Sequence, residues 1–218
     1  MTDLDGAVVL VVGASGGLGS RVAAQLSGAG STVVAASRAS GYDLREREMP
    51  SRLLADVTAA HGRLDGLVIA AGVVAFGPAD SASEQIVDEL FQVNVLGPMR
   101  LIRAATPLLA ASAAEGGRKP FVVTLSGVVA EAPTSGLAAY SASKAALLAF
   151  TVAAGRELRK SGIRLLDARP GHTETELSRH PIAGDAFAMP AGLDPDAVAA
   201  RIVRAVADDE RDLPSSAF

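Results

Sequence analysis

Tyr140 and Lys144 stand four positions apart in an alanine- and leucine-rich stretch, residues 136–155, which predicts a helix. Residues i and i+4 share one face of a helix, so a phenol and an ammonium would lie side by side. A free tyrosine titrates near pH ~10. A lysine charge about 4 Å away, at an effective dielectric of about 20, favours the phenolate by roughly 4 kcal/mol. We therefore expect the tyrosine pKa to fall by about 3 units before desolvation offsets part of it, which suits general acid/base chemistry.

The same pair also arises by chance in amphipathic helices, so the amino-terminal segment decides between chemistry and packing. Residues 7–12 form an apolar, β-branched run typical of a strand buried in a parallel sheet. A glycine-rich turn follows, and residues 20–29 predict a helix. This strand, turn and helix form the context of a dinucleotide site, where the helix amino terminus and close backbone approach receive a pyrophosphate. The candidate residues of the turn are Gly13, Ser15, Gly17, Leu18 and Gly19.

The end of the second predicted strand, residues 32–36, indicates which dinucleotide is bound. NAD sites usually place Asp or Glu there to accept from the ribose 2′-OH, whereas this chain has Ser37 and Arg38. A guanidinium suits a 2′-phosphate, and the Ser15 hydroxyl could add a contact. We therefore predict NADP(H) in preference to NAD(H), the alternative being that Arg38 is simply solvated.

The segment after Arg38 is too short for a crossover helix before Asp43 and Leu44. We expect either a very short third strand or a loop there, with both residues near the adenine. Residues 45–61 predict a helix with an irregular start at Pro50.

Further buried strands are predicted at residues 67–71, 120–125 and 162–168. Between the first two, residues 86–110 predict a helix capped by Ser81 or Ser83. Pro98 cannot donate to the carbonyl of Asn94, so this helix should bend there. The remaining expectations are a polar loop at 113–119, a mobile substrate loop at about 176–193, a helix at 195–208 capped by Asp194, and a candidate edge strand at 211–218.

Composition limits the function classes. The 218 residues, 49% hydrophobic and 20% charged, suffice for one compact domain spanning 1–218, and a net charge of −4 argues against a nucleic-acid binder. Without cysteine there is no disulfide or thiolate metal site, and the three histidines lack metal-ligand spacing. The start MTDLDG does not fit a secretory signal, and no apolar run is long enough for a membrane span. We expect a soluble, cytoplasmic protein.

Taken in order along the chain, these motifs resemble those of the short-chain dehydrogenase/reductase family. The resemblance implies a single-domain, Rossmann-like α/β fold, a doubly wound parallel sheet with helices on both faces. It also implies hydride transfer between NAD(P)(H) and an alcohol or carbonyl, here a small and rather apolar substrate. The motifs are Gly13-x3-Gly17-x-Gly19, Ala70-Ala71-Gly72, Asn94, Tyr140-x3-Lys144 and Pro170-Gly171-x3-Thr175.

By this resemblance Tyr140 is the acid/base, and Lys144 lowers its pKa and binds the nicotinamide ribose. Asn94 holds a water for a proton relay, and Thr175 meets the carboxamide. The cofactor supplies the hydride, and the protein supplies orientation and proton management. The other residues expected to touch the cofactor are Ala71, Gly72, Pro170, Gly171 and Thr173.

The chain departs from the family at the serine expected thirteen positions before the tyrosine, which is Gly127 here. Ser126 is one place away, and neighbouring strand residues face opposite sides, so it replaces the missing hydroxyl only if the chain slips by one. Losing one such donor can cost roughly 10²–10³ in rate. A non-catalytic NADP(H)-binding sensor or partner-binding module is therefore the alternative function, and a lyase or isomerase using the same tyrosine is a third.

Small residues along 138–155 would let a second copy of this helix pack closely. Family members often associate through this helix and the Asn94 helix. We therefore expect a homodimer or homotetramer.

Overall fold

A five-stranded, fully parallel sheet lies at the centre of the protein, in the order β2-β1-β3-β4-β5. The computed structural model describes residues 1–115 and 117–218. Each strand is four or five residues long, and β1, β3 and β4 are the buried apolar runs that the sequence predicts, whereas β2 is partly exposed. They are β1 (Val8–Val12), β2 (Thr32–Ala36), β3 (Gly66–Ile69), β4 (Phe121–Leu125) and β5 (Arg164–Ala168).

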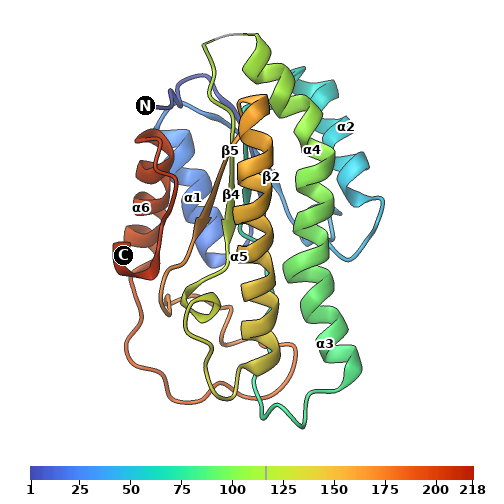
Figure 1. Ribbon diagram of the computed structural model, residues 1–218, viewed down its shortest axis with the longest axis vertical. Helices are drawn as coiled ribbons and strands as arrows, with labels where there is room; N and C mark the ends of the chain where they lie inside the picture. Colours follow the sequence, from blue (N-terminus) through green and yellow to red (C-terminus); the bar gives the residue numbers. More distant parts are fainter. Residues whose placement is uncertain (116) are drawn as a thin grey trace.

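Helices cover both faces of the sheet (Figure 1). On one face α1 and α6 pack together over β1, β4 and β5, and on the other α2, α4 and α5 cover the sheet. The predicted doubly wound α/β fold is therefore confirmed. The α-helices are α1 (Gly17–Gly28), α2 (Met49–His61), α3 (Glu84–Phe91), α4 (Gly97–Ala114), α5 (Ala138–Leu158) and α6 (Pro195–Ala207).

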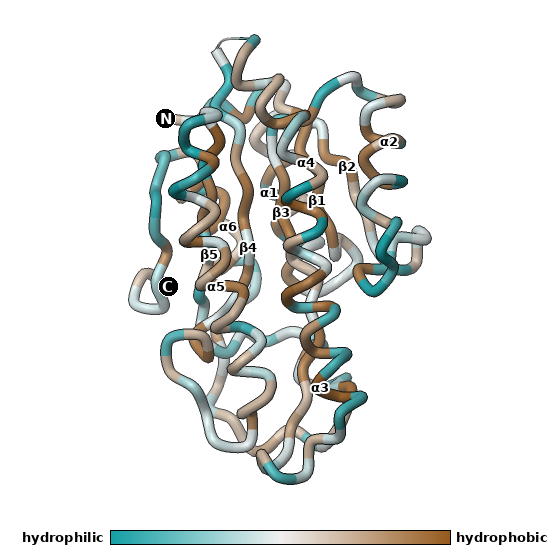
Figure 2. The backbone as a smooth tube through the Cα atoms, turned by 45° about the vertical axis from the view of Figure 1, so that its right-hand side comes forward, coloured by the Kyte–Doolittle hydropathy of each residue, from teal (hydrophilic) through white to brown (hydrophobic). Residues whose placement is uncertain are grey.

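Burial of the strands on both faces stabilises this arrangement. All five residues of β1 are buried, as are the four of β3, so two separate apolar cores form above and below the sheet. In Figure 2 the central strands β1 and β3 are largely brown, whereas teal residues gather on the outer surfaces of the helices. Such two-sided burial explains why these strands are continuous apolar runs without alternation.

The segment after β2 is a loop, which resolves the choice that the sequence left open. A short 3-10 turn, Arg38–Ser40, leads into the loop, and Leu44 turns inward, 4% exposed, against the α2 and α4 side of the sheet. The predicted start of the next helix at Arg45 is wrong, because α2 begins at Met49 with Pro50 in its first turn. Proline has no N–H and its ring crowds the preceding turn, so a helix accepts it only there.

The predicted bend at Asn94 is a π-helical segment, Gln92–Leu96, between α3 and α4. Pro98 lies in the first turn of α4 and cannot donate to the Asn94 carbonyl, which is why regular helix bonding is interrupted. The helix ends at Ala114 rather than Ala110. The polar loop predicted at 113–119 therefore begins later, and residue 116 within it lies outside the described residues.

The last part of the chain mostly follows the prediction. Asp194 caps α6 by accepting from the Asp196 amide, and Ser83 caps α3. The tail does not form the candidate edge strand, because Leu213 makes only a single parallel bridge, to Ala168. Over residues 1–115 and 117–218, the helices found are all too short or too polar to cross a membrane.

Candidate active site

A pocket of about 630 Å³ opens at the carboxyl ends of the strands, where the connecting loops gather at the bottom of Figure 1. In a doubly wound sheet this edge is where ligands bind. Nearly all residues singled out from the sequence line this pocket, and the two that do not are Gly19 and Asn94. The lining includes Gly13, Ser15, Gly17, Leu18, Ser37, Arg38, Asp43, Leu44, Ala71, Gly72, Ser126, Tyr140, Lys144, Pro170, Gly171, Thr173 and Thr175.

The glycine turn is shaped by close backbone contacts. Gly13 has φ +88°, and a Cβ there would come within 2.4 Å of the Ala71 amide nitrogen. A Cβ on Gly19 would lie 2.2 Å from the Gly13 carbonyl oxygen, so Gly19 serves helix–strand packing and does not face the pocket. Gly17 lies against the side chain of Thr175.

The start of α1 fits a pyrophosphate. Its N-cap residue is Gly16, which has no side chain to cap the first amides of the helix, and its first turn contains no acidic residue. The first amides of the helix thus point toward the pocket beside Ser15 and Gly17, which line it. Unpaired N–H groups and the positive end of the helix dipole are what a bound phosphate requires.

Two arginines flank the far end of the pocket, beyond β2. Arg45 binds the Asp43 carboxylate at 2.6 Å, and this hydrogen bond holds the pKa of Asp43 below its ordinary range. Ser37 caps the turn that contains Arg38 through a reciprocal bond with Ser40. Asp43 is therefore already neutralised by Arg45, which leaves the Arg38 guanidinium as the positive group beside the end of β2.

Tyr140 and Lys144 face the pocket from the first two turns of α5. The Lys144 Nζ lies 5.7 Å from the centre of the Tyr140 ring and donates to the Leu125 carbonyl at 2.7 Å. The expected lowering of the tyrosine pKa is wrong for this structure, because burial raises the pKa of Tyr140. Lys144 points to a backbone oxygen and not to the phenol, and burial lowers its own pKa to about 8 despite the Asp167 carboxylate.

Asn94 lies behind the pocket wall, 1% exposed. Its side chain pairs with the backbone of Val73, accepting from the amide at 3.0 Å and donating to the carbonyl at 2.9 Å. It also donates to Ser143, one residue before Lys144. A Cβ on Gly72 would lie 3.2 Å from Asn94 Oδ1 and 3.4 Å from Lys144 Nζ, so both groups lie close to Gly72, where the lack of a side chain leaves them room. The π-helical segment therefore places Asn94 beside the lysine.

Ser126 and Gly127 sit at the end of β4. Ser126 is fully buried and its hydroxyl donates to Asp167, away from Tyr140. Gly127 has φ +76° and ψ 168°, a backbone conformation that favours glycine. The Ser126 hydroxyl, which was the candidate to replace the missing serine beside Tyr140, is therefore bound to Asp167 instead.

The sequence analysis missed the apolar half of the pocket. Val74, Phe76 and Leu137 form a small third core with Met189 beside Tyr140, and Phe187 packs edge-to-face on Phe76 with ring centres 5.7 Å apart. These residues belong to irregular loops, so hydrophobic periodicity gave no signal for them.

The loop predicted over 176–193 closes this apolar half. Its residues Leu177, Ile182, Phe187 and Met189 line the pocket. The loop is attached to the opposite wall, since Ile182 donates to the Val74 carbonyl at 2.8 Å and Phe76 donates to Ala183 at 2.9 Å. It therefore forms part of the pocket wall.

Comparison with known proteins agrees with this geometry. A family model described as short chain dehydrogenase matches residues 37–184. The chain is 31% identical over 187 residues to 2,3-dihydro-2,3-dihydroxybenzoate dehydrogenase of Escherichia coli (strain K12), covering 81% of this chain and 73% of that protein.

Solved structures show the same fold. A short-chain dehydrogenase from Streptomyces avermitilis superposes with a TM-score of 0.83 at 29% identity, over 96% of this chain and 88% of that one. The 3-ketoacyl-(acyl-carrier-protein) reductase of Brucella melitensis, solved with NADH, gives 0.87 at 22% identity over 98% and 99%, which shows the fold alone. With a matching family model over most of its length, the chain belongs to the short-chain dehydrogenase/reductase family of oxidoreductases.

Proposed function

We propose that the protein is an NADP(H)-dependent oxidoreductase that transfers a hydride between nicotinamide and a small, rather apolar carbonyl or alcohol, with Tyr140 as the acid/base. The observation that carries the proposal is the position of Tyr140. Its ring stands between the apolar wall of Val74 and Leu137 and the buried Lys144 ammonium, in the same pocket as the glycine turn. A substrate carbonyl seated against that wall would meet the phenol.

The residues would divide the work as follows. Bound NADPH supplies the hydride. Tyr140 is protonated at neutral pH, as an ordinary tyrosine is, and burial raises its pKa further, so it can donate a proton to a carbonyl oxygen as that oxygen becomes negative. Lys144, anchored by Leu125, would supply positive charge near the resulting phenolate and a donor for the nicotinamide ribose. Asn94 would hold the Gly72–Val73 backbone, and with it this side of the pocket, in place and would take part in the proton relay.

The apolar wall supports the substrate class. Phe76, Leu137, Val129 and Met189 present no charge around Tyr140. An uncharged, compact substrate would therefore bind without leaving a buried charge unpaired, whereas a carboxylate beside these residues would lose its hydration without compensation.

NADPH oxidation with a panel of aldehydes, ketones and quinones tests the activity. Tyr140→Phe should lower turnover by roughly 10²–10⁴-fold while the NADPH dissociation constant stays within a factor of about three. Tyr42→Phe, which removes the hydroxyl of the chain's other tyrosine, at the Arg38 end of the same pocket and bonded to Asp56, is the matched control and should keep its kcat. Full turnover in Tyr140→Phe would contradict the assigned role. Tight NADPH binding without turnover on any panel member would favour the non-catalytic binding module.

The preference for NADP(H) rests on Arg38. It lies beside the pocket at the end of β2, where Asp43 is already bound by Arg45. Wild type should bind NADPH at least about tenfold more tightly than NADH, and Arg38→Gln should remove most of that difference. Arg103→Gln on α4 is the control and should change neither constant. Equal affinities in wild type would refute the preference.

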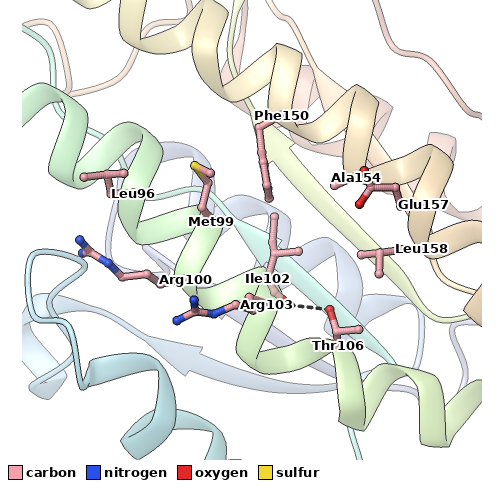
Figure 3. A pocket seen from close by; sticks show the side chains of 10 residues that line it. All are labelled: Leu96, Met99, Arg100, Ile102, Arg103, Thr106, Phe150, Ala154, Glu157 and Leu158. Carbon is pink, nitrogen blue, oxygen red and sulfur yellow. Dashed lines mark hydrogen bonds between the residues drawn. The ribbon is translucent and has the colours of Figure 1, made fainter.

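Oligomerisation is proposed through α4 and α5. A hollow of about 480 Å³ lies between these helices, and Figure 3 shows Leu96, Met99 and Phe150 along it. We expect a homodimer or homotetramer that covers this face. Met99→Arg, which changes a residue that lines the hollow, should shift the mass measured by light scattering toward the monomer, whereas Gln25→Arg on α1 should not; a monomeric wild type at micromolar concentration would overturn the proposal.

A further inference from the structure

Asp167, on β5, is a buried carboxylate that neither the cofactor nor the substrate part of the site explains. It is 4% exposed and faces α5 from the sheet. Its two oxygens accept from hydroxyls at the end of β4: Thr124 in the strand donates at 2.5 Å to one, and Ser126, the residue after the strand, donates to the other. A buried carboxylate whose hydrogen bonds come from neutral hydroxyls is costly, so its retention needs a reason.

The hydroxyls that bind Asp167 lie on either side of the residue that anchors the lysine. Leu125 stands between Thr124 and Ser126, and its carbonyl accepts from the Lys144 ammonium at 2.7 Å. In the parallel register Thr124 pairs with Asp167, so the carboxylate lies beside the end of β4 and connects the Thr124 and Ser126 hydroxyls. Thr151, two helical turns after Lys144 on α5, extends the network by bonding Thr124 at 3.0 Å.

The charged groups around Asp167 are few. Lys144 acts on it electrostatically from α5, and Arg169, just beyond β5, approaches to 3.8 Å. Arg169 is shared, because it also binds Glu131 and Asp212. β4 contributes hydroxyls only. Asp167 is thus the carboxylate whose charge acts on Lys144.

We propose that Asp167 is a positioning residue for Lys144. By binding Thr124 and Ser126 it fixes the Leu125 carbonyl to which the ammonium donates, and its negative charge keeps that ammonium protonated. This inference deepens the proposed function and rests on it for the role of Lys144 in turnover. It also explains why Ser126 faces away from Tyr140, since its hydroxyl is part of this support.

The titration behaviour of the two groups agrees with the geometry. Burial lowers the pKa of Lys144 to about 8, and the Asp167 carboxylate opposes that lowering. Burial raises the pKa of Asp167 to about 6, against the hydrogen bonds of Ser126 and Thr124 and the charges of Arg169 and Lys144. Between these two values, both groups are charged.

NMR titration of protein labelled with ¹³C at the lysine ε carbon tests this without substrate. The chain has only three lysines, and Lys119 and Lys160 are exposed. We expect the Lys144 resonance of wild type to titrate near pH 8, with a smaller inflection near pH 6 as Asp167 ionises. Asp167→Asn should lower the lysine midpoint by about one unit and remove the smaller inflection.

Asp65→Asn is the matched control. Asp65 is also buried and bound by a hydroxyl, that of Ser112, but lies at the other end of the sheet. It should leave the Lys144 midpoint unchanged. An unmoved midpoint in Asp167→Asn would overturn the inference. If that variant does not fold, a wild-type Lys144 resonance without the inflection near pH 6 overturns it equally.

The enzymatic counterpart separates this inference from the proposed function. The rate of carbonyl reduction should fall above about pH 8 in wild type, as Lys144 loses its proton, and about one unit lower in Asp167→Asn. No turnover in wild type, with the NMR coupling present, would count against the proposed function alone. Turnover with identical pH profiles in both proteins would count against the inference alone.

Discussion

Asp65 and Asp167 are both buried against the sheet, Asp65 at the edge formed by the amino ends of the strands and Asp167 at the edge formed by their carboxyl ends. Their carboxylates are bound by different partners. Asp65 precedes β3 at the amino edge and accepts from Arg63 at 2.6 Å, from the Ser112 hydroxyl and from the Val8 amide at 2.8 Å. Burial acts to raise the pKa of Asp65, but these bonds together hold it below its ordinary value. At Asp167 burial prevails, and the pKa rises to about 6.

This difference in pKa shows that one buried aspartate is used to stabilise the fold, whereas the other lies at the functional site. At the amino edge a dedicated arginine compensates the charge, so Asp65 ties β1, β3 and α4 together at little cost. At the carboxyl edge Arg169 is shared with Glu131 and Asp212, and the other cation that acts on Asp167, Lys144, is itself destabilised by burial and faces the pocket. A site that keeps two charges imperfectly compensated costs stability, and such groups concentrate where chemistry is done.

The largest stability effect is expected at the amino edge. Asp65→Asn leaves Arg63 without its partner and weakens the contacts to Ser112 and Val8, so the free energy of unfolding at pH 7 should fall by about 3 kcal/mol. Denaturant titration measures it, with Asp56→Asn on the surface of α2 as the control. A loss below about 1 kcal/mol would show that the two edges are not distinguished in this way.

A smaller, pH-dependent effect is expected at Asp167. Its native pKa of about 6 lies above the ordinary 3.8, so the native state binds the proton more tightly than the unfolded chain. Wild-type stability should therefore decline relative to Asp167→Asn as pH rises from about 4 to 6, by roughly 2–3 kcal/mol in all. Unfolding both proteins at pH 4, 5, 6 and 7 measures this, and a constant difference across the series would refute it.

The smallest effect is expected from restoring the family's serine. In Gly127→Ser the new side chain has room, since its Cβ would lie 3.6 Å from the Pro170 carbonyl. The residue must nevertheless adopt φ +76°, which should cost about 1 kcal/mol. Gly28→Ser on α1 is the control, because nothing lies within 4 Å of its Cβ and its φ is not positive. A Gly127→Ser variant as stable as wild type would show that the backbone there adapts.

The sequence predicted the regular part of the fold because that part depends on local patterns. The apolar runs of β1 and β4, the glycine turn and the Asp194 cap are each readable within about ten residues. The interruption at Asn94 followed from one proline. The start of α2 was placed too early, at Arg45, because the helical pattern of the sequence extends to both sides of Pro50. A proline is accepted in the first turn of a helix but not further inside, so the helix can begin only just before Pro50.

The electrostatics of the site could not be predicted in the same way. The spacing of Tyr140 and Lys144 placed both on one helix face but did not show that the ammonium turns to the Leu125 carbonyl. Asp167 and Arg169 looked like ordinary strand-end residues, because their partners Thr124, Ser126 and Glu131 lie some forty residues earlier. Tertiary neighbours of this kind leave no periodic signal.

The π-helical segment Gln92–Leu96 has a consequence for how such a site can be gained or lost. Its i→i+5 bonding accommodates one residue more per turn than the i→i+4 bonding of α3 and α4. Removing a single residue from this segment would take out that extra residue, turn α3 relative to α4 by roughly 100° and rotate Asn94 away from Gly72 and Lys144, while Pro98 would still leave one carbonyl without a helical donor. The step from a supporting helix to one that serves the pocket is thus a change of one residue in chain length, a kind of variation that substitution scans do not sample.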